Sequence, residues 1–193
     1  MKNNIIIIIS ILFSVFSVQG QTYVQGDGVL PFRSIANTPA LTDANRLNMN
    51  EAFQKCNEYI DSKILKPSTV NQMIGEYYFQ DNLLIKLISI NRNKNKEITE
   101  DGKEENLEET ADYLLEMYTQ NIYENEKYFV SHIIAKSNFK SLLYYDERDT
   151  YIRFTILDNA GKYRVMGSIN FKPNNLNNAR AFFDSFINSV TFK

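Results

Sequence analysis

Two stretches decide the fold: Tyr151-Ile-Arg-Phe-Thr-Ile-Leu157 and Lys162-Tyr-Arg-Val-Met-Gly-Ser-Ile-Asn-Phe171, joined by Asp158-Asn-Ala-Gly161. Each stretch alternates apolar and polar residues, which is the period of a β-strand with one buried face. The linker has the composition of a turn, and its glycine adopts a positive φ at no steric cost. The sequence therefore predicts a β-hairpin.

The alternation also predicts how the hairpin residues pair. One face is apolar, and its members are Ile152, Phe154, Ile156, Tyr163, Val165, Ile169 and Phe171. Placing Leu157 opposite Lys162 keeps this face intact and pairs Phe154 with Val165. A slip of one residue would turn one of the two apolar rows toward solvent.

The opposite face of the hairpin carries aromatic and basic side chains, namely Tyr151, Arg153, Thr155, Lys162, Arg164 and Met166. Such a strand surface can recognise an acidic or polar partner. The alternatives are an ordinary solvent face, or a face covered by the helix expected near Phe53. We take four of these residues as the candidate partner surface: Tyr151, Arg153, Lys162 and Arg164.

The N-terminus has the layout of a secretory signal peptide over residues 1–20. Lys2 precedes an apolar run over residues 5–18, and the small residues Val18 and Gly20 predict cleavage before Gln21. The alternative is a membrane anchor, for which the run is short compared with the roughly 20 residues of a span. Cleavage would place the chain in the periplasm or outside the cell, with no membrane-spanning segment.

Composition narrows the class of protein. The chain has 21 Lys and Arg against 23 Asp and Glu, and no basic stripe, so nucleic acid is not an expected partner. Cys56 is the only cysteine, which excludes an intrachain disulfide. The bias toward Ile, Asn and Lys, with no Trp, is typical of an AT-rich bacterial genome.

After an irregular leader over residues 21–42, which Val29, Leu30 and Phe32 could partly attach to the domain, the pattern predicts one α+β domain over residues 43–193. Its first helix begins at Thr42 or Asp43, either of which offers an N-cap oxygen, and ends near Lys63. Two further amphipathic helices are predicted over residues 107–122 and 176–190. Strands are predicted over residues 77–79, 83–90, 127–134 and 139–146. Because residues 83–90 are apolar on both faces, they are expected to form a central strand.

The pattern resembles the PsbP/Mog1/DcrB-like fold group over residues 75–193. The resemblance rests on the acidic helix 104–122, the hairpin 151–171, and the ending Ala179-Arg-Ala-Phe-Phe-Asp-Ser-Phe-Ile-Asn-Ser-Val-Thr-Phe-Lys193. It implies an antiparallel sheet layered with helices, an α/β/α sandwich, here preceded by an extra amphipathic helix. It also implies binding without catalysis. No functional residue of the group has a counterpart to carry over.

Chemistry-bearing residues are few. His132 is the only histidine, and its apolar strand predicts a core or half-buried side chain rather than a catalytic base. The acidic turn with Asp146 and Asp149 could join Asp158 in holding Ca²⁺, although a solvated turn is the simpler interpretation. No phosphate loop or dinucleotide motif occurs, so the sequence predicts neither a metal nor a cofactor.

Two hypotheses about function follow. The first is an exported, non-catalytic binding or accessory protein of the bacterial cell envelope, whose partner is another envelope protein or a small ligand. The second is a hydrolase that uses the carboxylates of Asp146 and Asp149.

Overall fold

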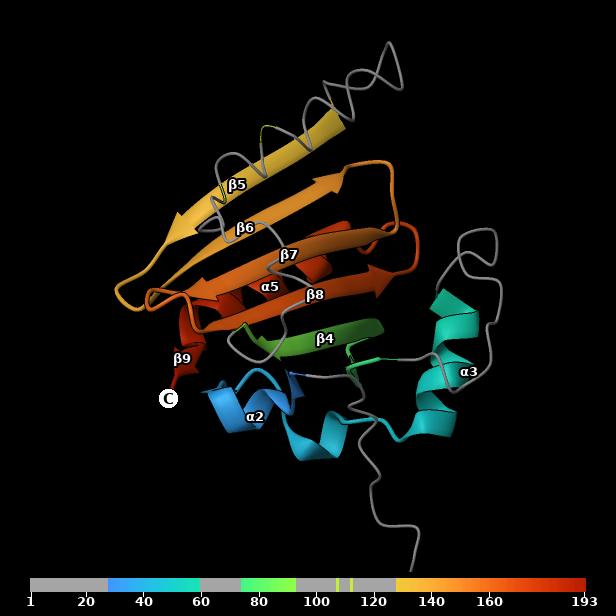
Figure 1. The fold of residues 1–193 in the computed structure, drawn as a ribbon. Coiled ribbons are helices and arrows are strands. Elements are labelled where there is room, and N and C mark those ends of the chain that lie inside the picture. Colours follow the sequence, from blue (N-terminus) through green and yellow to red (C-terminus); the bar gives the residue numbers. More distant parts are fainter. Residues whose placement is uncertain (1–27, 60–73, 93–106, 108–111, 113–127) are drawn as a thin grey trace, which may run out of the picture.

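A computed structural model describes residues 28–59, 74–92, 107, 112 and 128–193 of the chain. The predicted signal peptide and most of the predicted helix 104–122 lie outside the described residues. Leu107, which begins the apolar stripe of that helix, is buried. The described residues form an α+β fold with a mostly antiparallel sheet (Figure 1).

The main sheet has the strand order β1-β4-β8-β7-β6-β5, and β3 also pairs with β4. Its members are β1 (Val29–Leu30), β3 (Glu76–Gln80), β4 (Leu83–Asn91), β5 (Phe129–Ala135), β6 (Phe139–Asp146), β7 (Tyr151–Asp158) and β8 (Tyr163–Phe171). A small second sheet joins β2 (Ala36–Asn37) to β9 (Thr191–Phe192). The predicted strands are therefore present, with shifts of a few residues at their ends.

The hairpin of β7 and β8 forms, but the predicted register is wrong by two residues. Leu157 pairs with Arg164 instead of Lys162, and Phe154 pairs with Gly167 instead of Val165. A shift of two residues leaves every side chain on its predicted face, because the side-chain period of a strand is two. The apolar face is accordingly buried as predicted, apart from the partly exposed Tyr163.

A displacement of the hairpin loop by one position along the chain accounts for the shift. The N–H of Tyr163 donates to Oδ1 of Asp158 at 2.6 Å, so these two residues face each other at the loop ends. Gly161 has a φ of 65°, and its N–H donates to the carbonyl oxygen of Asp158 at 2.9 Å. The Asp158 side chain thus closes a four-residue loop over residues 159–162, one position later than the predicted turn over residues 158–161.

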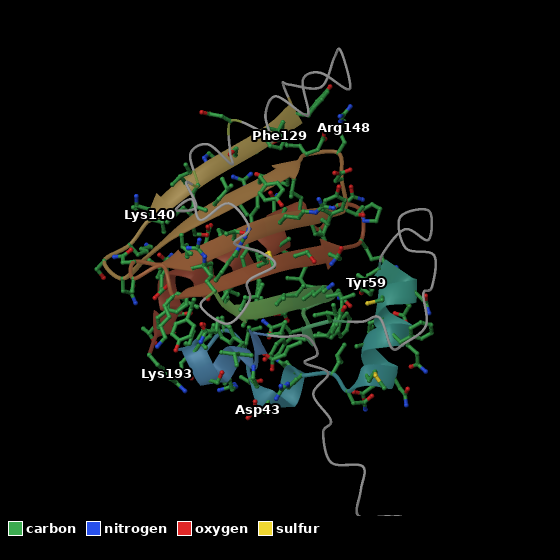
Figure 2. The ribbon with its side chains drawn as sticks, viewed as in Figure 1. Asp43, Tyr59, Phe129, Lys140, Arg148 and Lys193 are labelled. Atoms are coloured by element: carbon green, nitrogen blue, oxygen red, sulfur yellow. The ribbon has the colours of Figure 1, made fainter. Side chains whose placement is uncertain are left out.

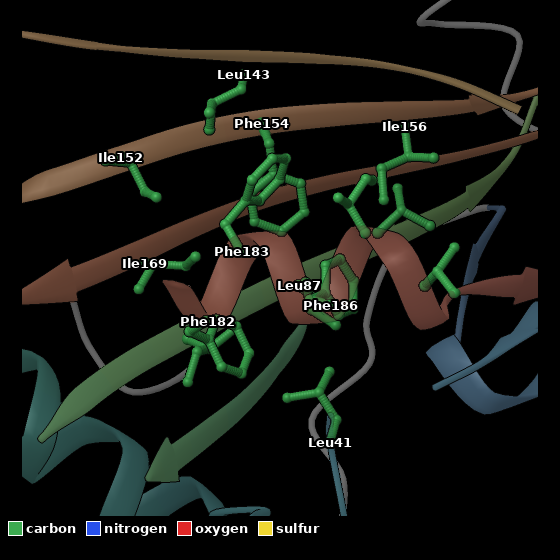
Figure 3. Packing of buried hydrophobic residues seen from close by; sticks show 14 of the residues in the cluster. Leu41, Leu87, Leu143, Ile152, Phe154, Ile156, Ile169, Phe182, Phe183 and Phe186 are labelled. Carbon is green, nitrogen blue, oxygen red and sulfur yellow. The ribbon is translucent and has the colours of Figure 1, made fainter. Parts of the chain in front are cut away.

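Helix α5 (Leu176–Ser189) lies across the apolar face of the sheet (Figure 1). Its buried residues are Ala179, Phe182, Phe183, Phe186 and Ile187. The ring centroid of Phe154 lies 5.3 Å from that of Phe183 and 5.5 Å from that of Phe186 (Figure 3). The prediction of an amphipathic helix over residues 176–190 is confirmed, and its apolar stripe contacts Phe154 of the hairpin.

Helix α3 (Met49–Tyr59) begins later than predicted, because Asn48 caps it instead of Thr42 or Asp43. The side-chain oxygen of Asn48 accepts hydrogen bonds from the N–H groups of Asn50 and Glu51 at 3.0 Å. The Glu51 carboxylate in turn accepts from the N–H of Asn48 at 2.9 Å, which completes a capping box. Asp43 instead begins a short 3₁₀ turn, η1 (Asp43–Asn45).

The leader is more ordered than its sequence predicts. Within residues 28–42 the chain forms β1, the short helix α2 (Phe32–Ile35) and β2. Phe32 and Ile35 are each 1% exposed and join the main core. The prediction of an irregular conformation is therefore wrong for residues 29–37, whereas the attachment of the leader to the domain through Val29, Leu30 and Phe32 is confirmed.

Candidate functional site

The structure separates the four predicted surface residues into two pairs. Tyr151 and Arg153 lie on the same face of β7, with the guanidinium carbon 4.8 Å from the centre of the tyrosine ring. Arg153 pairs with Ser168, and Arg164 lies four positions earlier on β8, about 13 Å away along the strand. The predicted register placed the two arginines only two positions apart. Lys162 lies in the hairpin loop, beyond Arg164.

The loop end of the hairpin holds Lys162 in a contact of its own. Its ammonium lies 4.7 Å from the centre of the Tyr163 ring, and a hydrogen bond with Tyr163 raises the pKa of the lysine. Lys140, on β6, is a second exposed cation toward this end of the sheet. Figure 2 shows Lys140 at the opposite end of the molecule from Tyr59, which closes α3. Lys162 is therefore a separate basic position and no neighbour of Arg153.

A different set of residues joins Arg153 across the sheet. Tyr144 of β6 pairs with Arg153, Arg153 pairs with Ser168 of β8, and Ser168 pairs with Lys86 of β4. Paired residues on adjacent strands project from the same face, and strands are about 4.8 Å apart. Arg153 and Lys86 thus lie two strands apart, about 10 Å, with a serine hydroxyl between them. We call Tyr144, Arg153, Ser168 and Lys86 the cationic row.

Neither cation of the cationic row forms an ion pair with a carboxylate of the described residues. Among the described residues, no carboxylate lies within ion-pair distance of Arg153 or Lys86. Burial lowers the pKa of the Lys86 ammonium, and the nearby Cys56 only partly opposes this shift. Arg153 is exposed, whereas Lys86 is partly buried beside the ring of Tyr77, 5.7 Å from its centre. Within the described ranges, the row therefore presents positive charge that no carboxylate pairs with.

Sequence reasoning missed Lys86. The prediction treated residues 83–90 as apolar on both faces, and β4 is indeed a largely buried strand. The available signal was a single cation in an otherwise apolar strand, since an unpaired charge is costly to bury. Its cross-strand neighbours, Ser168 and Arg153, could only be identified from the correct register.

Helix α3 borders the cationic row without covering Arg153. Ala52 of α3 packs on Tyr77 and Leu84, with Cys56 at the edge of this small cluster. The alternative that the helix near Phe53 covers the whole face is therefore wrong at Arg153. Burial raises the pKa of Cys56 to about 11, so this thiol is protonated at neutral pH and is not an activated nucleophile.

The alternative cation site, in which Asp146 and Asp149 join Asp158, does not assemble. Asp146 ends β6, whereas Asp158 pairs with Phe139 at the start of that strand, about 23 Å away along it. Arg148 holds Asp146: its backbone N–H and Nε donate to Oδ1 at 2.9 and 2.8 Å, and its Nη2 donates to Oδ2 at 2.5 Å. Within the described ranges, no group of three His, Cys, Asp or Glu side chains could hold a metal ion.

Asp146→Asn is expected to lower the free energy of unfolding at pH 7 by about 1 kcal/mol, because the carboxylate loses its hydrogen bonds with Arg148. The side-chain hydrogen bond from Arg148 lowers the pKa of Asp146. The ionised Asp146 carboxylate therefore stabilises the fold at pH values above the ordinary carboxyl pKa of about 4. This stabilisation is lost as the pH falls through the lower pKa that Asp146 has in the folded protein. Urea unfolding from pH 2 to 7 should show a flatter profile for Asp146→Asn. If the pH profiles of the wild type and Asp146→Asn run parallel, Asp146 does not stabilise the fold through its ionised carboxylate. Asp149→Asn serves as the control.

The prediction for His132 is wrong, because this residue is exposed on β5. The apolar residues around it suggested a covered strand, but β5 stands last in the order of the main sheet.

No helix within the part of the chain that the structure describes is long and apolar enough to cross a membrane. Comparison of the chain with protein-family models, curated proteins and solved structures finds no match.

Proposed function

We propose that this chain is an exported, non-catalytic binding or accessory protein of the bacterial cell envelope. It contacts an acidic or polar group of another envelope protein or of a small ligand through the cationic row. The observation that carries the proposal is the placement of Arg153 and Lys86 on one row without a carboxylate neighbour among the described residues.

The chemistry of the row suits an anionic group. Arg153 offers a planar fork of donors for a carboxylate or phosphate, and Lys86 offers a point charge. Between them, the hydroxyl of Ser168 accepts a hydrogen bond from Nδ2 of Asn170 at 3.2 Å. A partner's anion would supply a counter-charge that the described residues do not, so binding would offset the cost of keeping Lys86 partly buried.

The proposal includes a PsbP-like α/β/α layering of residues 75–193, with the first amphipathic helix as an addition. The position of α5 on the apolar face supports one helical layer. The packing of Ala52 on Tyr77 and Leu84 supports a second helix on the opposite face.

Arg153→Ala is expected to weaken partner binding by at least tenfold, because a charge-assisted hydrogen bond contributes about 1.5–3 kcal/mol. The assay is capture of envelope components of the native host on immobilised protein, followed by titration of the captured component. Lys162→Ala is the matched control: it removes an exposed cation outside the cationic row and should leave capture unchanged. An identical set of captured components for wild type and Arg153→Ala would refute the proposed surface.

Lys86→Met is expected to raise the midpoint of thermal unfolding by about 3 °C while weakening binding. Methionine has a similar length and removes the cost of desolvating an ammonium, which is the cause of the lowered pKa of Lys86. A group that destabilises the fold yet supports binding is typical of a functional residue. Calorimetry and the capture assay test both effects together. A variant that is more stable and binds normally would remove Lys86 from the site.

No observation favours the second hypothesis, a hydrolase that uses Asp146 and Asp149. Both oxygens of Asp146 accept hydrogen bonds from Arg148, which holds the carboxylate ionised and leaves it no role as a proton donor. An activity screen of the wild type with Asp146→Asn and Asp149→Asn decides the question. Hydrolysis lost in both variants, with folding retained, would replace the binding proposal.

A further inference from the structure

The sheet holds the two cations of the cationic row at a fixed separation. Arg153 pairs with Ser168, and Ser168 pairs with Lys86, so the cations stand two strands apart. Adjacent strands are about 4.8 Å apart, which places the two residues about 10 Å from each other across the sheet. Because β4, β8 and β7 are joined by continuous antiparallel ladders, the backbone maintains this separation.

Aromatic rings restrain both charged side chains. The guanidinium carbon of Arg153 lies 4.8 Å from the centre of the Tyr151 ring, and the ammonium of Lys86 lies 5.7 Å from the centre of the Tyr77 ring. A cation near the face of a ring is attracted by its negative π-surface. Both charges are therefore partly ordered before a ligand arrives, which lowers the entropy cost of binding.

The residues from Arg153 to Lys86 present hydrogen-bond donors. Arginine and lysine side chains donate hydrogen bonds and accept none. Between them, Oγ of Ser168 accepts a hydrogen bond from Nδ2 of Asn170 at 3.2 Å, and its own hydroxyl hydrogen can donate to a ligand. A complementary ligand therefore offers acceptors in a line, with an anionic group at each end.

The exposed end of the cationic row favours a protein as the partner. Arg153 is exposed, and Tyr144, its cross-strand neighbour, is half-exposed. Arginine and tyrosine are enriched in protein–protein interfaces and among the residues that contribute most to binding. Small molecules usually occupy concave pockets, whereas this row crosses four neighbouring strands of a sheet.

We infer that the partner is a protein segment that presents two carboxylates about 10 Å apart, one for Arg153 and one for Lys86. This inference rests on the proposed function and adds the chemistry and spacing of the ligand. The first carboxylate can accept two parallel hydrogen bonds from the guanidinium. The second meets a half-buried ammonium, where water screens the attraction less. Once one contact has formed, the other is intramolecular, so the pair binds more tightly than either carboxylate alone.

Helical peptides can measure the preferred spacing. An α-helix rises about 1.5 Å per residue, so glutamates at positions i and i+4, i+7 or i+11 lie on one face about 6, 10.5 or 16.5 Å apart. Three alanine-rich peptides of about 20 residues, long enough to form helices, would differ only in this spacing and carry equal charge. The i, i+7 peptide is expected to bind the purified protein at least tenfold more tightly than the other two, as measured by isothermal titration calorimetry.

Variants of the protein test whether both cations take part. Arg153→Ala and Lys86→Met each leave one contact, so the three peptides are expected to bind either variant with affinities within about twofold of one another. Lys162→Ala, which removes a cation outside the cationic row, is the control and should retain the preference for the i, i+7 peptide. A purely structural role of Arg153 or Lys86 would not change a preference for spacing.

Several outcomes would overturn the inference: tightest binding at another spacing, equal binding of the three peptides, or binding of none. A preference for i, i+7 that survives Arg153→Ala or Lys86→Met would also overturn it. The capture assay separates these failures from failure of the proposed function. If capture of envelope components still depends on Arg153, the cationic row binds its partner without the two-carboxylate spacing. If capture does not depend on Arg153, the proposed function itself is wrong.

Discussion

Gly167→Ala is expected to lower the free energy of unfolding by about 3 kcal/mol, since forcing even one methyl into a packed core has a cost of this order. A Cβ on Gly167 would lie 2.1 Å from Cζ of Phe154 and 2.6 Å from both Cε atoms. The ring cannot move aside easily, because Phe154 is 2% exposed and packs against Phe183 and Phe186. Urea unfolding followed by circular dichroism measures the loss.

A double-mutant cycle identifies the cause. In a Phe154→Leu background the ring atoms that meet the new methyl are gone, so Gly167→Ala should cost less than about 1 kcal/mol. Ser168→Ala, one residue along β8 on the opposite face, should change stability by less than about 1 kcal/mol. Equal losses from Gly167→Ala in both backgrounds would show that the ring contact does not explain the effect.

Glu76→Ala is expected to lower the free energy of unfolding by about 4 kcal/mol, because it breaks a buried ion pair by removing one partner. The Glu76 carboxylate is almost fully buried and accepts hydrogen bonds from Arg46 and from the backbone N–H of Phe32. The second bond satisfies the first turn of α2, where Pro31 offers no side-chain cap. The truncation leaves a guanidinium and a helix N–H without their acceptor.

The controls separate charge from hydrogen bonding. Glu76→Gln keeps an acceptor for the N–H of Phe32 and should cost less than Glu76→Ala. Replacing both Glu76 and Arg46 with leucine should restore much of the loss, since a buried pair exchanged for apolar residues is often tolerated. Asp43→Asn, which breaks the exposed pair with Arg33, should cost less than about 1 kcal/mol. If Glu76→Ala lowers the free energy of unfolding by no more than Asp43→Asn does, the buried contacts of Glu76 with Arg46 and Phe32 do not stabilise the fold as argued.

The regions predicted well are those where one side-chain period dominates. The hairpin faces alternate strictly, and the helical stripe of residues 176–190 places its aromatic residues on one side. Both patterns follow from burial of apolar surface, which depends on local periodicity. The leader lacked such a pattern, because Phe32 and Ile35 lie in elements too short to show a period. Their burial depends on partners far away in the chain.

The candidate site could be predicted only in part. Arg153 was identified because it alternates with buried residues on a strong strand. Its grouping with Arg164 was wrong because the predicted hairpin register was wrong. Lys86 was missed because no sequence pattern links it to a strand more than 60 residues later. Cross-strand proximity depends on the register of three strands together.

By itself, the sequence determined the strands β3 to β8, the closing helix, and which face of the hairpin is buried. The helix rests on its apolar stripe, and the buried face of the hairpin rests on side-chain alternation, which survives any shift of two residues. Only the tertiary structure decided between registers that bury the same residues. The space above Gly167 admits the ring of Phe154, and the carboxylate of Asp158 closes the loop, so one register packs without a clash. That choice placed Lys86, Ser168 and Arg153 side by side, and with them the surface on which the proposed function depends.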